Sequence, residues 1–331
     1  MQTQSASPRK EGAAPVPAHQ PGDRAAHPMK RSLLLSMVVP VAAIAALAVP
    51  AASSAQTPAA RVQLAVGTQY DSTHVYVTPG SVNAFVTSWE ATFGGTNTKP
   101  VVTDVTPTPS TTVSELVLSP VGTLSIFDYQ TPAPYPFGAE RTGWLVTNLD
   151  KGVRTAEADG ADLVVSPFAD PIGKDAVIQF PGGVDAQLYV HNTPPSYAPL
   201  TSVPQNRIYL SPDAADAFLH SYLRFTDGHV TSDNRHADGA QIGLPGTEYR
   251  RITISSPFGD TVLTVTDGHL PYPFGRETTG YSVTDLGTTI AKAQAAGAKV
   301  LWGPYTSKNL DSAILQFPGG YIAEIHSTPS H

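Results

Sequence analysis

Tyr-Pro-Phe-Gly occurs at residues 135–138 and again at 272–275, and Gln-Phe-Pro-Gly-Gly occurs at residues 179–183 and 316–320. Both motifs are separated from their copies by the same 137 residues. The same spacing links single residues between the motifs: Gly143 with Gly280, Val146 with Val283, Gly160 with Gly297, and Pro167 with Pro304. A repeat of this length decides the architecture before any other feature does. The sequence therefore predicts two related domains in tandem.

Each copy contains the same order of secondary structure twice. Residues 72–77 alternate polar and apolar side chains as a half-buried strand does, and residues 79–93 place apolar side chains at helical intervals. Two further strands are expected at residues 113–119 and 124–129, on either side of a turn. The order then recurs from near residues 143, 207 and 281. We expect four β-α-β-β-β modules, two in each copy.

The boundary between the copies is expected in a proline-rich stretch at residues 193–204. Proline is unsuited to a central strand and favours an extended spacer. We therefore assign residues 56–192 to the first domain and residues 205–331 to the second.

The beginning of the chain has the pattern of a secretory signal peptide. Residues 1–28 form a polar extension, and residues 29–55 contain a basic start, an apolar run and small residues at a cleavage site. A transmembrane anchor is the other interpretation, which the short apolar run and Pro40 disfavour. Met29 is an alternative to Met1 as the start. We expect a secreted or periplasmic protein with no membrane contact beyond the signal peptide.

Composition points to a small-molecule partner. The 331 residues carry a formal net charge of -7 without a basic run, which argues against nucleic acid or an anionic membrane surface. There is no cysteine, so disulfides, thiolate metal sites and a cysteine nucleophile are excluded. The sequence does not predict the oligomeric state.

The paired modules resemble the vicinal oxygen chelate superfamily. The phrases that carry the resemblance are Gly280-Tyr-Ser-Val-Thr-Asp-Leu-Gly287, Ala295-Ala-Gly-Ala-Lys-Val300 and Phe317-Pro-Gly-Gly-Tyr-Ile-Ala-Glu-Ile325. The group includes glyoxalase I, bleomycin-resistance proteins, fosfomycin-resistance enzymes and extradiol dioxygenases. The resemblance covers residues 70–192 and 204–328, and it implies an α+β fold in which each pair of modules curls a mixed sheet into a cup. Because the superfamily spans lyases, isomerases, dioxygenases and pure binders, the fold alone does not choose a function.

The resemblance also implies that a bound metal would lie on the first and last strands of the modules. Glu324 matches the carboxylate ligand position in the second copy, whereas the first copy has Gln187 there. Three interpretations of Glu324 remain open: an ion pair with Arg207, a metal ligand, or a base that acts without metal. His326 would complete a metal site, transfer a proton, or serve only as a hydrogen-bonded histidine. The ligand set for a divalent metal is incomplete.

Strand parity sorts the remaining candidates between the two cups, because alternate residues of a strand share a face. If the protein is an enzyme, the second cup is the better site, with Glu324, Arg207, His326 and Tyr209 as catalytic residues and Gln205 beside them. The first cup would be lined by His74, Tyr76, Arg141, Gln187, Tyr189 and His191. Both lists are polar and aromatic, which suits a small oxygenated ligand.

Two further segments have open interpretations. The repeated Tyr-Pro-Phe-Gly motif, with Tyr272 and Phe274 in the second copy, would close over a ligand as an aromatic lid or pack the modules together. Residues 227–238, Asp-Gly-His-Val-Thr-Ser-Asp-Asn-Arg-His-Ala-Asp, invite a metal proposal, but their Asp and Asn content favours a solvated loop.

Three functions remain after this reasoning. The first is an exported, glyoxalase-like protein that acts on a small oxygenated molecule, with metal-assisted lyase, isomerase or dioxygenase chemistry in the second cup. The second is a metal-free binding or sequestering protein of the bleomycin-resistance type. The third is a purely structural duplicated domain.

Overall fold

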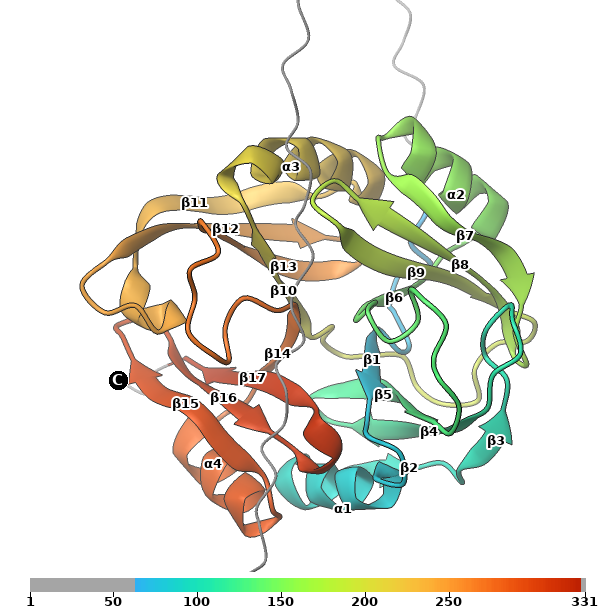
Figure 1. Cartoon of the computed structure of the whole chain (residues 1–331), viewed down its shortest axis with the longest axis horizontal. Helices are drawn as coiled ribbons and strands as arrows, with labels where there is room; N and C mark the ends of the chain where they lie inside the picture. Colours follow the sequence, from blue (N-terminus) through green and yellow to red (C-terminus); the bar gives the residue numbers. More distant parts are fainter. Residues whose placement is uncertain (1–62, 329–331) are drawn as a thin grey trace, which may run out of the picture. The chain divides into compact units, whose positions relative to one another are not determined.

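Four modules of similar topology follow one another along the chain (Figure 1). The computed structural model describes residues 63–328, so the predicted signal peptide lies outside the described residues. The first module consists of β1 (Thr73–Tyr76), α1 (Val82–Phe93), β2 (Thr96–Asn97), β3 (Val101–Thr103), β4 (Thr112–Ser119) and β5 (Gly122–Tyr129). The second consists of β6 (Gly143–Leu145), α2 (Leu149–Ala158), β7 (Asp162–Ala169), β8 (Gly173–Phe180) and β9 (Val184–His191).

The second copy repeats this plan with longer first strands in both modules. Its first module contains β10 (Gln205–Leu210), α3 (Pro212–Thr226), β11 (His229–Asp238), β12 (Glu248–Ser256) and β13 (Gly259–Val265), with a 3₁₀ turn at Gly239–Ile242. Its second module contains β14 (Thr278–Ser282), α4 (Leu286–Ala295), β15 (Lys299–Thr306), β16 (Asp311–Gln316) and β17 (Ile322–Ser327), with a 3₁₀ turn at Pro318–Gly320. The sequence predicted the order of the modules, but it missed β2, β3 and β11.

Residues 229–238 correct one expectation. They form strand β11 at the edge of the sheet rather than a loop, and all of them except Ala237 are exposed. The segment lacks an apolar alternation because neither of its faces packs on a core, so the pattern that identifies strands is absent. It is solvated, as expected, but it is a strand.

The strands form three sheets in which each module has the same internal order. In the second copy the two modules join through the antiparallel pair β10 and β14, giving one eight-stranded sheet in the order β11-β12-β13-β10-β14-β17-β16-β15. In the first copy the sheets of the two modules, β1-β5-β4-β2 with β3 and β6-β9-β8-β7, meet at a single bridge between Thr73 and Thr142. Each sheet is mixed, because the first strand of every module runs parallel to the last.

Local capping fixes where the helices begin and end. The side chain of Ser211 accepts a hydrogen bond from the backbone of Ala214 at the start of α3, and Asp285 accepts one from Thr288 at the start of α4. Gly160 follows α2 with a φ of +94°, a left-handed conformation that glycine adopts without steric cost.

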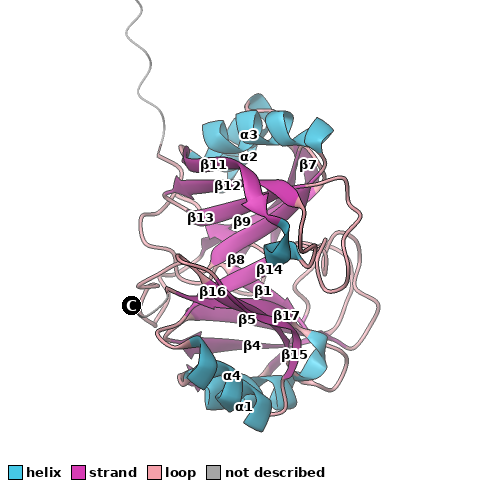
Figure 2. Ribbon diagram, turned by 90° about the vertical axis from the view of Figure 1, so that its left-hand side faces the viewer, coloured by secondary structure: helices cyan, strands magenta, loops and turns pink. Residues whose placement is uncertain are grey.

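The helices pair across the two copies rather than within them. Figure 2 shows α2 beside α3 at one end of the strands and α1 beside α4 at the other. Trp89 of α1 is fully buried, and its ring lies 4.9 Å from that of Tyr281 in β14. Trp144 of β6 similarly contacts Tyr222 of α3, with ring centroids 5.8 Å apart. The two large apolar cores therefore combine residues from both copies, whereas a smaller one lies within the second copy.

The two copies are connected by residues 192–204, which contain no helix or strand. Leu200 in this segment is buried, and its backbone N–H donates to the carbonyl of Gln69 at 2.7 Å. The connection is thus anchored to the first copy. Among residues 63–328, no helix is both long and apolar enough to span a membrane.

Candidate functional site

Of the cavities inside the two cups, the larger lies in the first cup, between its two modules. A wider, open hollow of about 400 Å³ lies beside Tyr272 and Trp302 of the second copy. Strands β1 and β6 form the seam of the first cup, where the N–H of His74 donates to the carbonyl of Arg141 at 3.0 Å and that of Gly143 donates to Ser72 at 3.3 Å. The cavity of this cup measures about 300 Å³. That is within the range of small-molecule sites.

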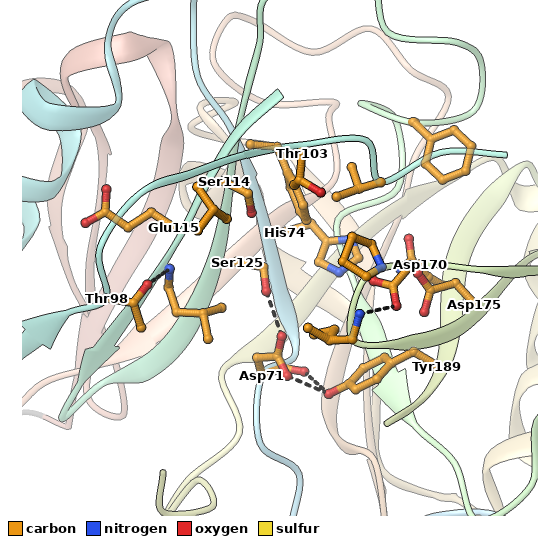
Figure 3. Close-up of a pocket in the computed structure, with 18 of the residues that line it drawn as sticks. Asp71, His74, Thr98, Thr103, Ser114, Glu115, Ser125, Asp170, Asp175 and Tyr189 are labelled. Carbon is orange, nitrogen blue, oxygen red and sulfur yellow. Dashed lines mark hydrogen bonds between the residues drawn. The ribbon is translucent and has the colours of Figure 1, made fainter. Parts of the chain in front are cut away.

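Aromatic and acidic side chains dominate the lining of this cavity. Figure 3 shows His74 between the strand that carries Ser125 and the side that carries Asp170, Asp175 and Tyr189. The aromatic rings come from Tyr76, Phe127, Tyr129, Phe137 and Tyr189, and the carboxyl groups that accompany them belong to Asp71, Glu115, Glu140, Asp170 and Asp175.

His74 stands over a buried carboxylate. Its Nδ1 is 3.7 Å from Oε1 of Glu140, which is fully buried and also accepts a hydrogen bond from the Tyr76 hydroxyl. Burial, followed by the charge of Glu140, raises the pKa of Tyr76 well above its ordinary value, so the phenol keeps its proton and donates it. The trio holds the imidazole in the wall of the cavity.

Gly143 makes room for that imidazole. A β-carbon at this position would lie 2.7 Å from Nε2 of His74, closer than non-bonded atoms approach. Gly280 has the same role in the second copy, where a β-carbon would lie 2.4 Å from Nε of Arg207. This close approach explains why a glycine recurs at the 137-residue spacing, because each cup places a bulky polar side chain against the neighbouring strand.

Asp71 joins the two modules of the first copy at one end of the cavity (Figure 3). Its Oδ2 accepts a hydrogen bond from Ser125 of β5 at 2.6 Å, and its Oδ1 accepts one from Tyr189 of β9 at 2.8 Å. The carboxylate therefore has its partners within the protein and is a structural element of the wall.

Asp175 differs from Asp71 because its carboxyl group has no partner. It is only 4% exposed, lines the cavity from β8, and makes no hydrogen bond or ion pair with any residue between 63 and 328. Burial and the nearby charges of Asp170 and Asp71 raise its pKa well above the ordinary value. The surroundings of Asp175 therefore disfavour its charged form.

The second cup is nearly filled by its own side chains. Arg207 Nη2 lies 3.1 Å from Glu324 Oε2, and His326 Nδ1 lies 2.8 Å from the same oxygen. Arg207 also donates to Gln205 at 3.0 Å. The expected ion pair across this cup is confirmed. The remaining space is about 30 Å³, which holds little more than one water molecule.

Tyr209 and Phe274 line this small space, but Tyr272 does not. Burial raises the pKa of Tyr209 above its ordinary value, so its hydroxyl remains protonated. In both copies the Tyr-Pro-Phe-Gly motif turns its phenylalanine inward and its tyrosine outward: Phe137 and Phe274 are buried, while Tyr135 and Tyr272 are among the most exposed large side chains.

Arg141 lies outside the first cup. Its guanidinium stacks over the ring of Tyr76 at 5.3 Å and, with Glu277, lines a separate space of about 60 Å³ between the copies. Burial is the main cause that raises the pKa of Glu277 to about 7, against the opposing influence of Asn206 and Arg141. The other residues predicted for the first cup, His74, Tyr76, Gln187, Tyr189 and His191, line its cavity together.

Neither cup offers a set of donors that fits a divalent metal. Between residues 63 and 328, no three His, Asp or Glu side chains gather in a geometry that would hold an ion. In the second cup, Oε2 of Glu324 is shared by Arg207 and His326, while Oε1 is buried without a hydrogen-bond partner between residues 63 and 328. The guanidinium beside this carboxylate would repel a cation. In the first cup, Gln187 supplies only a neutral amide at the matching position. The residues present do not fit the metal that the resemblance implies.

The polar side chains of β11 lie at the surface and pair with residues of the neighbouring strand β12. His236 pairs with Glu248 at 2.6 Å, and Asp233 pairs with Arg250 at 2.7 Å, all on the surface. These partners account for the charged side chains without a metal.

Sequence reasoning missed all five acids that line the first cup: Asp71, Glu115, Glu140, Asp170 and Asp175. A signal for Glu140 was present, because Glu-Arg-Thr-Gly at 140–143 matches Glu-Thr-Thr-Gly at 277–280 within the repeat. A signal for Asp175 was weaker: it is a charged residue directly before the apolar run of a predicted strand. Asp71 precedes its strand and gave no pattern.

Comparison with solved structures identifies the fold. A triple mutant of 4-hydroxymandelate synthase from Streptomyces coelicolor aligns with 80% of this chain and 94% of its own, at 12% identity and a TM-score of 0.53. Weaker matches include 2,2',3-trihydroxybiphenyl 1,2-dioxygenase from Sphingomonas wittichii strain RW1, with 11% identity, 79% and 90% coverage and a TM-score of 0.47. The Mn(II)-bound glyoxalase from Novosphingobium aromaticivorans gives 14% identity, 79% and 83% coverage and a TM-score of 0.44.

No family model and no curated protein sequence matches the chain. At these identities the structural likeness shows the fold alone. The chain has the α+β fold of vicinal oxygen chelate proteins, with mixed sheets curled into cups, as the sequence predicted. The roles of its site residues therefore follow from the contacts and chemistry of this chain alone.

Proposed function

We propose that this vicinal-oxygen-chelate-like protein binds a small, partly apolar molecule in its first cup without the help of a metal. The observation that carries the proposal is the difference between the cups: about 300 Å³ of space in the first and about 30 Å³ in the second. The aromatic rings of the first cup supply apolar contact, and His74, Gln187 and Asp175 supply polar groups that orient a ligand.

Metal-assisted chemistry in the second cup has less support. Oε2 of Glu324 is engaged by Arg207 and His326, and the guanidinium disfavours both a bound cation and protonation of this carboxylate as a base. The first cup lacks a carboxylate at the equivalent place, because Gln187 stands there. The metal-free binding protein is therefore the function that this arrangement favours.

An uncharged fluorescent probe tests the proposal on the mature chain, residues 56–331. N-phenyl-1-naphthylamine gains fluorescence in apolar surroundings, and we expect saturable binding at one site per chain. Leu116→Trp places a large ring in the cavity, which Leu116 lines, and should abolish that binding. Ser114→Phe is a second blocking variant at another lining residue, in case the first does not fold.

A matched control exists at the same register in the second cup. Leu116 pairs with Ser125, the partner of His74, whereas Thr253 pairs with Val262, the partner of Arg207. Thr253→Trp should leave probe binding unchanged. If the wild-type protein shows no saturable binding, or if the blocking variants bind as well as the control, the proposed function is wrong.

We also propose that the protein is exported, on the strength of residues 29–55. N-terminal sequencing of the protein recovered from a secreting bacterial host should give a chain that begins near Gln56. Recovery of an intact Met29 start in the cytoplasm would contradict export.

A further inference from the structure

The carboxyl group of Asp175 is buried in the first cup without a partner. A buried polar side chain normally finds a hydrogen bond or an ion pair, because leaving it without either costs about 1–3 kcal/mol. Asp175 is 4% exposed and faces the cavity from β8, beside Tyr189 of β9. A group from outside the chain would supply the missing partner.

The surroundings of Asp175 are negative. Asp170 comes from the hairpin between β7 and β8, and Asp71 comes from the segment before β1; both charges act on Asp175 in the same direction. Asp71 is occupied by its hydroxyl donors, and Asp170 accepts a hydrogen bond from the backbone of Ile172 at 3.0 Å. The remaining titratable groups on this side are Tyr189 and His191 of β9.

Between residues 63 and 328, no lysine or arginine acts on Asp175. Burial raises the pKa of Asp170, and the charge of His191 opposes that rise only in part. Lys99 lines the cavity from the connection between β2 and β3, but it is exposed and contributes nothing to the pKa of Asp175. The rings of Tyr76, Phe127 and Tyr189 complete the walls, and the faces of aromatic rings also attract cations. The cup therefore combines one acid without a partner, Asp175, and a neighbouring acid, Asp170, with an apolar interior.

We propose that Asp175, supported by Asp170, binds the ammonium group of an organic amine whose apolar body fills the rest of the first cup. The inference rests on the proposed function and narrows it to a class of ligand. An ammonium group would donate its hydrogen bonds to Asp175 and offset the repulsion between the two acids. Binding would then favour the ionised carboxylate of Asp175, so that a proton is released to the solvent.

Two compounds of nearly the same shape test this. 1-Naphthylmethylamine carries an ammonium group at neutral pH, and 1-naphthalenemethanol carries a hydroxyl group in its place. We expect the amine to displace N-phenyl-1-naphthylamine from the mature protein at a concentration about 10- to 100-fold lower than the alcohol, the range of a charged hydrogen bond. Asp175→Asn should remove that preference while retaining the affinity for the alcohol.

A matched control removes a different buried acid. Asp185 is 5% exposed, has a pKa raised by burial and accepts a hydrogen bond from Gln179 at 2.9 Å, but it does not line the cavity. Asp185→Asn should keep the preference for the amine. Calorimetry in phosphate and in Tris should further show that the amine releases a proton on binding and that its affinity rises with pH.

The outcomes separate this inference from the function on which it rests. Equal affinity for amine and alcohol, or an unchanged preference in Asp175→Asn, overturns the ammonium site and leaves the binding function intact. Tighter binding of the alcohol also overturns it and assigns Asp175 the role of a neutral hydrogen-bond donor. Failure of the fluorescent probe itself to bind overturns both.

Discussion

Gln187 and Glu324 occupy the same place in the two copies: each is paired with the glycine of a neighbouring parallel strand, Gly143 in the first copy and Gly280 in the second. The position of His74 corresponds in the same way to that of Arg207. A carboxylate facing a guanidinium closes the second cup with an ion pair, whereas an amide and an imidazole make no such bond. The differences between Gln187 and Glu324, and between His74 and Arg207, therefore account for the open cavity of the first cup and the nearly filled second cup.

The ion pair of the second cup is expected to matter for stability. Arg207→Met removes the cation and leaves Glu324, 4% exposed, with only His326, so we expect a loss of about 3 kcal/mol in the free energy of unfolding. The double variant Arg207→Met with Glu324→Gln removes both charges and should recover most of the lost free energy of unfolding. Urea denaturation at neutral pH measures both, and a double variant less stable than the single one would contradict this account.

Glu277 is expected to make stability depend on pH. Its pKa is about 7 in the folded protein and near 4.5 when unfolded, so the stability that it contributes is fully present below pH 4.5 and is lost as the pH rises through 7. Glu277→Gln should therefore gain about 2 kcal/mol relative to the wild type between pH 4 and pH 8, after allowance for its partial exposure. Denaturation at both pH values tests this. A constant difference between the two proteins would show that Glu277 does not titrate in this range.

Gly143 is expected to control the position of His74. Gly143→Ala would push a methyl group against Nε2, so the imidazole has to move into the cavity, with a cost of about 1–3 kcal/mol and weaker binding of the fluorescent probe. Gly287→Ala is the control, because a β-carbon there meets only Asp285 at 3.7 Å. It should bind the probe normally. Unchanged probe affinity in Gly143→Ala would show that His74 does not shape the cavity.

The Tyr-Pro-Phe-Gly motif is expected to act through its phenylalanine. Phe137 is 7% exposed and packs edge-to-face on Phe168, so Phe137→Ala should cost about 3 kcal/mol and weaken probe binding. Tyr135 is 72% exposed, and Tyr135→Ala should change stability by less than about 0.5 kcal/mol. Thermal unfolding and probe titration of the two variants measure the contrast. A large loss of binding in Tyr135→Ala alone would favour the lid interpretation.

The sequence revealed the repeat, the order of the modules and part of the lining of the first cup, because all three depend on local periodicity. Arg141 was placed in that cup wrongly. The sequence could not show which cup is open. That depends on how far a long side chain such as Arg207 extends across its cup, and on partners such as Glu140 that lie far away in the chain. The family resemblance drew attention to Glu324 as a ligand position, and the structure places there the ion pair with Arg207, one of the three interpretations that the sequence left open.

The sequence also could not predict which helices pack together, because an apolar helix face does not identify its partner. In the structure, Trp89 of the first copy packs on Tyr281 and Phe317 of the second, at ring distances of 4.9 Å each. At the other end of the strands, Phe180 of the first copy packs on Phe218 of the second, with ring centroids 5.9 Å apart. The two repeats are thus joined along both of their helical faces.

This shared packing predicts that neither copy folds alone. If the two halves, residues 56–203 and residues 204–331, are expressed separately, each should expose its side of both large cores. Exposed apolar surface of this kind leads to association or to loss of fixed packing. Mixed together, the halves should assemble and restore the near-ultraviolet circular dichroism of the buried Trp89 and Trp144. A cooperative unfolding transition of either half by itself would instead show that the repeat consists of two independent domains, with the helix contacts added afterwards.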